Sequence, residues 1–202
     1  MIKLYSYVIT HDSGFAPNPY WGYCTLATCK PRIRSSAQVG NWIIATGSKD
    51  GVGNGKLVYA LRVDEVLPLE KYYDDPRFDV KKPIVGDDIQ LCGDNIYFRK
   101  DGEWKQRRNF HHKEEDMETD VSGKNVLIAE HFYYFRNDAV DVPPEYRSLV
   151  AKGRGHRSNF NPALVEEFIV WLQTNFRAGI HGETRNLIRR EQSNNSFNRS
   201  AS

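Results

Sequence analysis

Dense runs of β-branched and aromatic residues, separated by segments rich in Gly and Pro, dominate the first half of the chain. Leu4–Thr10, Asn41–Thr46 and Lys56–Val66 are such runs, and each predicts a largely buried strand. The Gly-rich segment 47–55 lies between the second and third runs, which predicts an antiparallel hairpin. Farther along, Asn125–Arg136 predicts one more strand that can carry a bulge.

The middle of the chain, from Asp79 to Ser122, is polar and irregular. Short strands are expected at Asn95–Arg99 and near Trp104. The highly charged segment 111–120, which begins with His111 and His112, is expected to be a solvated loop.

Helical signals are short until the C-terminal part. Residues 69–75 predict one or two turns, and Pro143-Pro144 open a short helix through Val150. The strongest helix follows Asn161, which can cap it, and Pro162, which fits its first turn. Its expected buried face consists of Val165, Phe168, Ile169 and Leu172.

The order of these elements, strands first and the strongest helix last, favours an α+β domain over a Rossmann fold. We expect a small twisted β-barrel or sheet with flanking helices and a long C-terminal helix. A single domain is expected over 1–188, because 202 residues suit one folding unit. The polar segment 189–202, with repeated Ser and Asn, is expected to be a disordered tail.

Composition changes this picture little, but it limits the class of protein. Three cysteines are a small and odd number, which argues against a secreted disulfide framework. The N-terminus reaches polar residues too early for a signal peptide. No apolar stretch is long enough to span a membrane. We therefore expect a soluble cytoplasmic protein. The net charge of +2 is too small to indicate a polyanion partner by itself, so the placement of the charges decides.

The hairpin segment VGNWIIATGSKDGVGNGKLVYALRVDEVLP and the following YYDDPRF resemble the PUA-like domains of the EVE group. With YSYVITHDSGFAPNPYWGYCTLATCKPRIR before them and GRGHRSNF after them, most of the chain resembles the nucleotide modification associated domain, second type. One departure is Asn41, where EVE-type hairpins often carry Asp. The resemblance implies a PUA-like fold, a role in pathways of modified bases, and a groove that holds a base or a short strand.

The best local signal for binding is GRGHRS, residues 153–158. Arg154, His156, Arg157 and Ser158 lie on Gly-containing backbone just before the expected helix, a combination that suits a phosphate. The alternative is a basic loop that only joins two helices.

A second candidate surface begins at Tyr20 and Trp21, whose rings on a Pro-containing loop can stack on a base. Lys30, Arg32 and Arg34 follow at every second position, so in an extended chain they share one face. A basic stripe beside aromatic rings is what a groove for a nucleic-acid strand requires. The alternative is that Trp21 closes one end of the barrel.

Candidate catalytic residues are His11, Asp12, His156 and His181, which could meet in the same groove. Asp12 also fits a turn, and the loop around His181 also fits a helix end. Cys24 and Cys29 with His11 or His156 allow a zinc site, but four intervening residues and no second Cys pair make it a minor alternative. We expect no metal and no cofactor.

Three functions remain open from these patterns. The preferred one is a module that binds a nucleotide, DNA or RNA and recognises a base, including a modified one. The alternative is an enzyme that acts on a nucleotide base or its phosphate. A weaker alternative is an interaction protein that docks a partner through segment 111–120. The aromatic and basic residues favour the first, since no recognised catalytic spacing is present.

Overall fold

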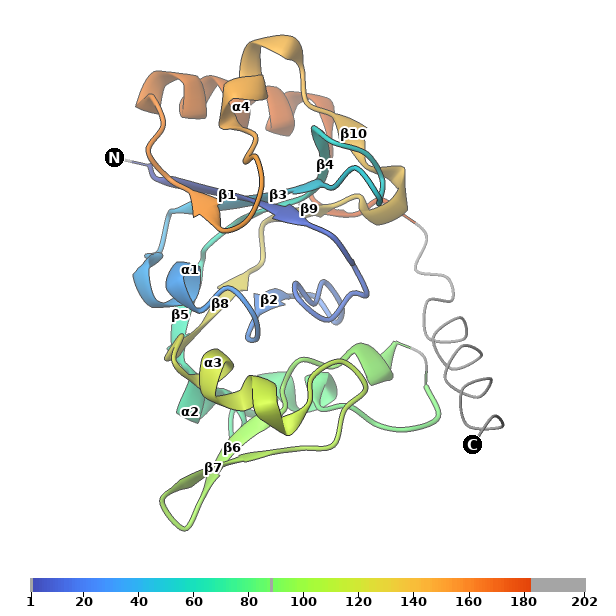
Figure 1. Cartoon of the computed structure of the whole chain (residues 1–202), viewed down its shortest axis with the longest axis vertical. Coiled ribbons are helices and arrows are strands. Elements are labelled where there is room, and N and C mark those ends of the chain that lie inside the picture. Colours follow the sequence, from blue (N-terminus) through green and yellow to red (C-terminus); the bar gives the residue numbers. More distant parts are fainter. Residues whose placement is uncertain (1, 88, 183–202) are drawn as a thin grey trace.

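A computed structural model describes residues 2–87 and 89–182, and it stacks four layers on one another. In Figure 1, helix α4 (Pro162–Asn175) lies on one face of the largest sheet, and a smaller sheet with helix α1 (Pro31–Ser36) lies on the other. The fourth layer lies beyond the smaller sheet and contains residues from the middle of the chain. The tail predicted over 189–202, and the end of the domain predicted at 188, lie outside the described residues.

The largest sheet contains the predicted first strand and the predicted hairpin. Its path is β11-β1-β3-β4-β9-β12, and β10 also pairs with β4. β1 runs parallel to β3, and β3 runs antiparallel to β4, so the hairpin is confirmed. The strands are β1 (Leu4–Ile9), β3 (Trp42–Gly47), β4 (Lys56–Arg62), β9 (Phe132–Tyr134), β10 (Val140–Asp141), β11 (His156–Arg157) and β12 (Gly179–Ile180).

Two smaller sheets complete the strands of the described residues. One has the order β2-β8-β5, with β2 (Cys24–Leu26), β8 (Asn125–Ala129) and β5 (Glu65–Pro68), all antiparallel. The other is a hairpin of β6 (Tyr97–Lys100) and β7 (Glu103–Gln106), at the place where short strands were predicted. The described residues form several sheets together with helices, which confirms the α+β class. These sheets are open, and the described residues contain no closed barrel.

Two runs that were each predicted as one strand divide between the two larger sheets. The run 56–66 leaves the largest sheet after Arg62, and the run 125–136 enters it after a break at Glu130 and His131. The Asp64 carboxylate fixes this corner: its Oδ2 accepts hydrogen bonds from the main-chain N–H groups of Glu130 and His131, at 2.8 and 3.0 Å. Each run therefore contributes to two sheets.

The predicted C-terminal helix is formed as α4. The Asn161 side chain accepts a hydrogen bond from the Ala163 N–H at 3.0 Å, and the four predicted apolar residues are buried. The predicted helix before Val150 is a 3₁₀ helix, Pro144–Leu149. The other helices are α2 (Leu69–Tyr72), α3 (Met117–Val121) and the 3₁₀ turns Pro76–Lys81, Gln90–Cys92, Glu114–Asp116 and Arg136–Asp138.

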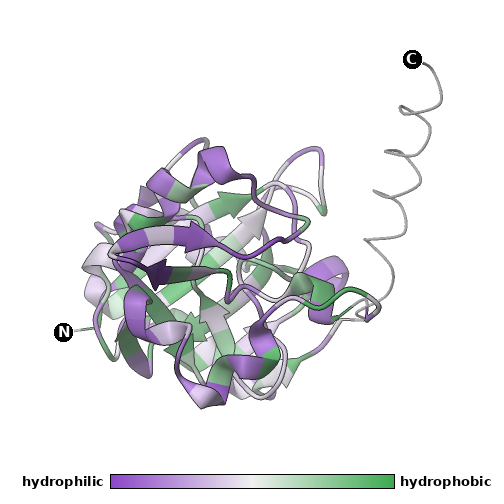
Figure 2. Cartoon of the chain, turned by 90° about the horizontal axis from the view of Figure 1, so that it is seen from below, coloured by the Kyte–Doolittle hydropathy of each residue, from purple (hydrophilic) through white to green (hydrophobic). Residues whose placement is uncertain are grey.

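Three apolar clusters hold the layers together. The first lies between α4 and the largest sheet, the second between the two larger sheets and α1, and the third between the smaller sheet and the fourth layer. Figure 2 shows the hydrophobic residues concentrated on the inner strands and the hydrophilic residues on outer loops and helices. No helix in the described part is long and apolar enough to cross a membrane.

Candidate functional site

Residues 29–34 form a turn into a helix, which overturns the prediction of an extended basic stripe. Cys29 and Lys30 have positive φ angles of 55° and 41°, and α1 begins at Pro31. Helical geometry turns Arg34 into the interior, where it is fully buried, while Arg32 remains exposed. Arg34 is therefore a structural residue rather than part of a binding surface.

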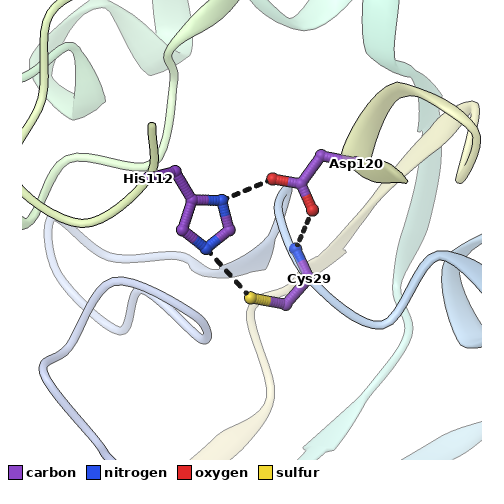
Figure 3. A group of neighbouring side chains, drawn as sticks. All are labelled: Cys29, His112 and Asp120. Carbon is purple, nitrogen blue, oxygen red and sulfur yellow. Dashed lines mark hydrogen bonds and ion pairs between the residues drawn. The ribbon is translucent and has the colours of Figure 1, made fainter. Parts of the chain in front are cut away.

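The turn at Cys29 brings its thiol to two side chains from the middle of the chain. His112 Nε2 lies 3.3 Å from Cys29 Sγ, and His112 Nδ1 lies 2.6 Å from Asp120 Oδ2 (Figure 3). Cys29 comes from the β2–α1 connection, His112 from the loop after β7, and Asp120 from α3. We call these three residues the triad.

Asp120 is held from several directions. Its Oδ1 accepts a hydrogen bond from the Cys29 N–H at 2.7 Å, and its Oδ2 accepts one from the Tyr97 hydroxyl at 2.8 Å. Arg34 donates to the main-chain oxygens of Asp120, Cys29 and Asn125, the last two at 2.7 and 2.8 Å. Both carboxylate oxygens and the surrounding main chain are therefore fixed.

The structure corrects the expectation that His111 and His112 are solvated. Both rings are half-buried against Phe15, with ring centroids 4.6 and 5.0 Å away. Burial and the nearby charge of His112 lower the pKa of His111 to about 4. Burial also lowers the pKa of His112, but its bonds to Asp120 and Cys29 outweigh this and raise the pKa to about 10.

Among the described residues, the triad is also the group of side chains whose donor atoms could hold a metal ion, since these atoms lie within 4.8 Å of one another. The zinc alternative drawn from sequence shares only Cys29 with this group. Cys24 is fully buried in β2, and neither His11 nor His156 belongs to this group. None of the three cysteines forms a disulfide.

A cluster of positive side chains lies where β1, β11 and the start of α1 meet. The pKa of His156 is lowered by burial and by the positive charges of Arg32, Lys3 and Lys30. Lys3 Nζ lies 4.9 Å from the Tyr5 ring centroid, and that ring also contacts the His156 ring at 5.8 Å. We call Lys3, Lys30, Arg32 and His156 the cation cluster.

None of the cation cluster forms an ion pair with a described carboxylate. The eight ion pairs of residues 2–87 and 89–182 all involve other side chains. Lys30 instead points over the ring of Tyr7, with Nζ 4.3 Å from the centroid. Positive charges that converge without a counter-charge create a site that attracts anions.

The rest of the predicted phosphate loop lies near the cation cluster through the pairing of β11 with β1. Arg154 is exposed, and Ser158 is half-buried. Arg157 is exposed but donates to the main-chain oxygens of Ser148 and Val150, at 3.1 and 3.3 Å.

The predicted aromatic platform is largely internal. Tyr20 is 5% exposed, and its ring packs edge-on against Trp21 with centroids 5.6 Å apart. The buried ammonium of Lys81 donates to the main-chain oxygens of Asn18, Tyr20 and Tyr23, which fixes the loop from inside. Tyr20 thus supports the loop, and Trp21 is the ring of this pair that is partly exposed.

The proposed convergence of His11, Asp12, His156 and His181 is wrong. His156 and His181 lie at opposite edges of the largest sheet, next to β1 and β9. Asp12 has the turn role: its Oδ1 accepts hydrogen bonds from the Gly14 N–H at 3.2 Å and the Tyr134 hydroxyl at 2.7 Å. His11 and His181 are exposed.

Comparison with known proteins gives one match. A family model described as nucleotide modification associated domain 2 matches residues 1–191. No curated protein and no solved structure matches the chain.

Proposed function

Since this chain belongs to the nucleotide modification associated domain 2 family, we propose that it binds a nucleotide through the cation cluster. The family associates the chain with nucleotide modification. The proposed ligand is a nucleotide phosphate, either free or within DNA or RNA, next to a base that the pathway modifies. We also propose that the fold is related to PUA-like domains and that the protein is cytoplasmic, as the sequence led us to expect.

The observation that supports binding is the uncompensated charge of the cation cluster. Lys3, Lys30 and Arg32 lie close enough to His156 for their positive charges to add to the effect of burial in lowering its pKa. Folding brings these like charges together without a carboxylate among the described ion pairs, at an electrostatic cost. A phosphate would remove this repulsion and accept hydrogen bonds from the guanidinium of Arg32.

Arg154 and Trp21 extend the proposed surface. Arg154 is exposed in the loop that leads into β11, and it can contact a second phosphate of a strand. Trp21 is partly exposed and offers part of one ring face to a base. Tyr20 and Arg34, which are buried, have supporting roles in this proposal.

Binding of nucleoside monophosphates and of matched oligonucleotides, with and without base modification, tests the proposal across a salt series. We expect affinity to fall with salt. Lys30→Gln with Arg32→Gln should weaken binding and reduce the salt slope by about one for each phosphate that the variant no longer neutralises. Lys100→Gln, at an exposed position of β6, is the matched control.

The His156 ring gives an independent readout. Burial and, after it, the surrounding positive charges lower the pKa of His156, so a bound phosphate that offsets these charges should raise it. An NMR titration with inorganic phosphate or a nucleoside monophosphate measures this change. No binding, or equal binding by the Lys30→Gln/Arg32→Gln variant, would remove the cation cluster as the site.

A further inference from the structure

We propose that Cys29 is the nucleophile of an acyl-transfer enzyme that hydrolyses an amide or ester, with His112 as its acid–base partner and Asp120 as the orienting carboxylate. This activity goes beyond binding and stands on a different part of the molecule, the triad of Figure 3. We further propose that a nucleotide carries the acyl group, and this part rests on the proposed function. The assignment of Cys29 as the nucleophile is independent of it.

The connectivity of the triad is that of a nucleophile, a base and an orienting group. His112 contacts the thiol through one ring nitrogen and the carboxylate through the other, at 3.3 and 2.6 Å. The carboxylate therefore fixes the ring and leaves Nε2 directed at Sγ. A buried cysteine with only a packing role requires no such pair of contacts.

Several contacts hold the residues of the triad in fixed positions. Cys29 is held at a positive φ of 55°, and its N–H is bound to the Asp120 carboxylate. Arg34 connects the main chains of Cys29 and Asp120 from below. A left-handed residue other than Gly costs free energy, and such strain is typical of catalytic turns. Cys29 and His112 are half-buried, whereas Asp120 is buried.

His112 is placed for the first step of the reaction. Its Nε2 lies 3.3 Å from Cys29 Sγ, close enough to take the thiol proton as the sulfur attacks. Lys30, the next residue in the chain, also interacts electrostatically with Cys29. The Cys29 N–H is already bound to Asp120 and is therefore not available to stabilise the oxyanion of the reacting carbonyl.

The same geometry argues against a metal at the triad. Both Asp120 oxygens already accept hydrogen bonds, from the Cys29 N–H on one side and from His112 and Tyr97 on the other. An ion between Sγ and Nε2 would have two protein ligands, whereas zinc sites in proteins use three or four. The carboxylate acts on the histidine rather than on a shared ion.

The proposed reaction proceeds in two balanced steps. The thiolate attacks the acyl carbon, an S–C bond forms, the bond to the leaving amine or alcohol breaks, and His112 gives that group its proton. Neutral His112 then takes a proton from water, whose oxygen attacks the thioester. The C–S bond breaks with its electron pair returning to sulfur. The net change is addition of one water to one amide or ester.

The test uses an activated ester, p-nitrophenyl acetate, with the full chain and no nucleotide, so it can fail without affecting the binding proposal. We expect a burst of p-nitrophenol close to one per chain, and an acetyl adduct on Cys29 by peptide mass spectrometry. Cys24 and Cys92, both buried, are internal references and should stay unmodified. Metal analysis of the same sample should find no stoichiometric zinc.

Variants separate a catalytic role from a structural one. Cys29→Ala should abolish the burst, and His112→Gln should slow it by about 10²-fold or more. His131→Gln, a partly buried histidine away from the triad, should leave it unchanged. Acetylation of Cys29 at equal rates in wild type and His112→Gln, or one tightly bound zinc per chain, would overturn the proposal. The presence or absence of an acetyl adduct on Cys29 of the wild-type protein tests the proposal even if a variant fails to fold.

Discussion

The cation cluster and the triad meet at the turn of Cys29 and Lys30, yet they differ in how far their polar groups are paired within the protein. In the cation cluster, four basic side chains lie together without an ion pair among the described residues. In the triad, the thiol, both ring nitrogens and both carboxylate oxygens have partners within the protein. Within the described part of the chain, one region has no carboxylate ion pair, and the polar atoms of the other are paired with one another.

This difference is what the two proposals require of a surface that recognises a ligand and of a site that performs chemistry. A recognition surface keeps its charge unpaired until the ligand arrives, which makes binding sensitive to salt. A nucleophile needs fixed geometry before the substrate arrives, because small displacements lower the rate. Under the two proposals taken together, a nucleotide phosphate held by Lys30 would place an attached acyl group beside Cys29.

The largest expected effect on stability comes from the side chain that supports the triad. Arg34→Met removes three hydrogen bonds to main-chain oxygens and the ion pair with Asp120, at 4.0 Å. Leaving these buried acceptors and the carboxylate without a partner should cost about 3–5 kcal/mol of unfolding free energy. Urea denaturation measures it.

Arg32→Met, two positions earlier on the exposed side of α1, is the matched control. It should reduce stability little but weaken phosphate binding. An Arg34→Met protein as stable as the control would show that the triad does not depend on this support.

A smaller effect, with a defined pH range, is expected at His112. Its pKa is about 10 in the folded protein and 6.5 when unperturbed. A raised histidine pKa stabilises the folded state fully below about pH 6.5, and this contribution is lost as the pH rises toward 10. His112→Gln should therefore lower Tm most near pH 6 and least near pH 10. Thermal melts across this range test it, and a deficit that grows with pH would contradict the ion pair with Asp120.

The smallest effect on stability is expected in the cation cluster. Arg32→Gln removes an exposed charge that has no ion-pair partner among the described residues, so unfolding free energy should change by no more than about 0.5 kcal/mol. The variant should nonetheless bind nucleoside monophosphates more weakly, as calorimetry at low salt can measure. A clear drop in stability would mean that Arg32 is paired within the protein and is not held for a ligand.

The sequence predicted the elements whose signals are local. The hairpin of β3 and β4 follows from two apolar runs around Gly-rich punctuation, and α4 follows from the Asn161 cap and its apolar face. The runs 56–66 and 125–136 were wrong as single strands because their breaks depend on the Asp64 corner, which joins residues far apart in the chain. Nothing within either run marks this division.

The triad could not be predicted for a similar reason. Asp120 and His112 lie in a charged segment whose composition indicates solvent, and their burial comes from contact with Phe15 and Arg34 of the N-terminal part. The one local signal was Pro31: it fits the first turn of a helix, so Cys29 precedes a helix and Arg34 turns inward. The basic residues Lys30, Arg32 and His156, by contrast, were identified from sequence as binding candidates.

The proposed role of His112 and Asp120 is to make Cys29 a reactive nucleophile, and the rate at which iodoacetamide alkylates Cys29 at pH 6 tests this role. At this pH an ordinary thiol, with a pKa near about 8.5, reacts slowly. We expect Cys29 to react much faster than glutathione in the same tube, and His112→Gln to remove that advantage while Cys24 and Cys92 stay unlabelled. If Cys29 reacts no faster than glutathione, with or without His112, then His112 and Asp120 do not activate its thiol.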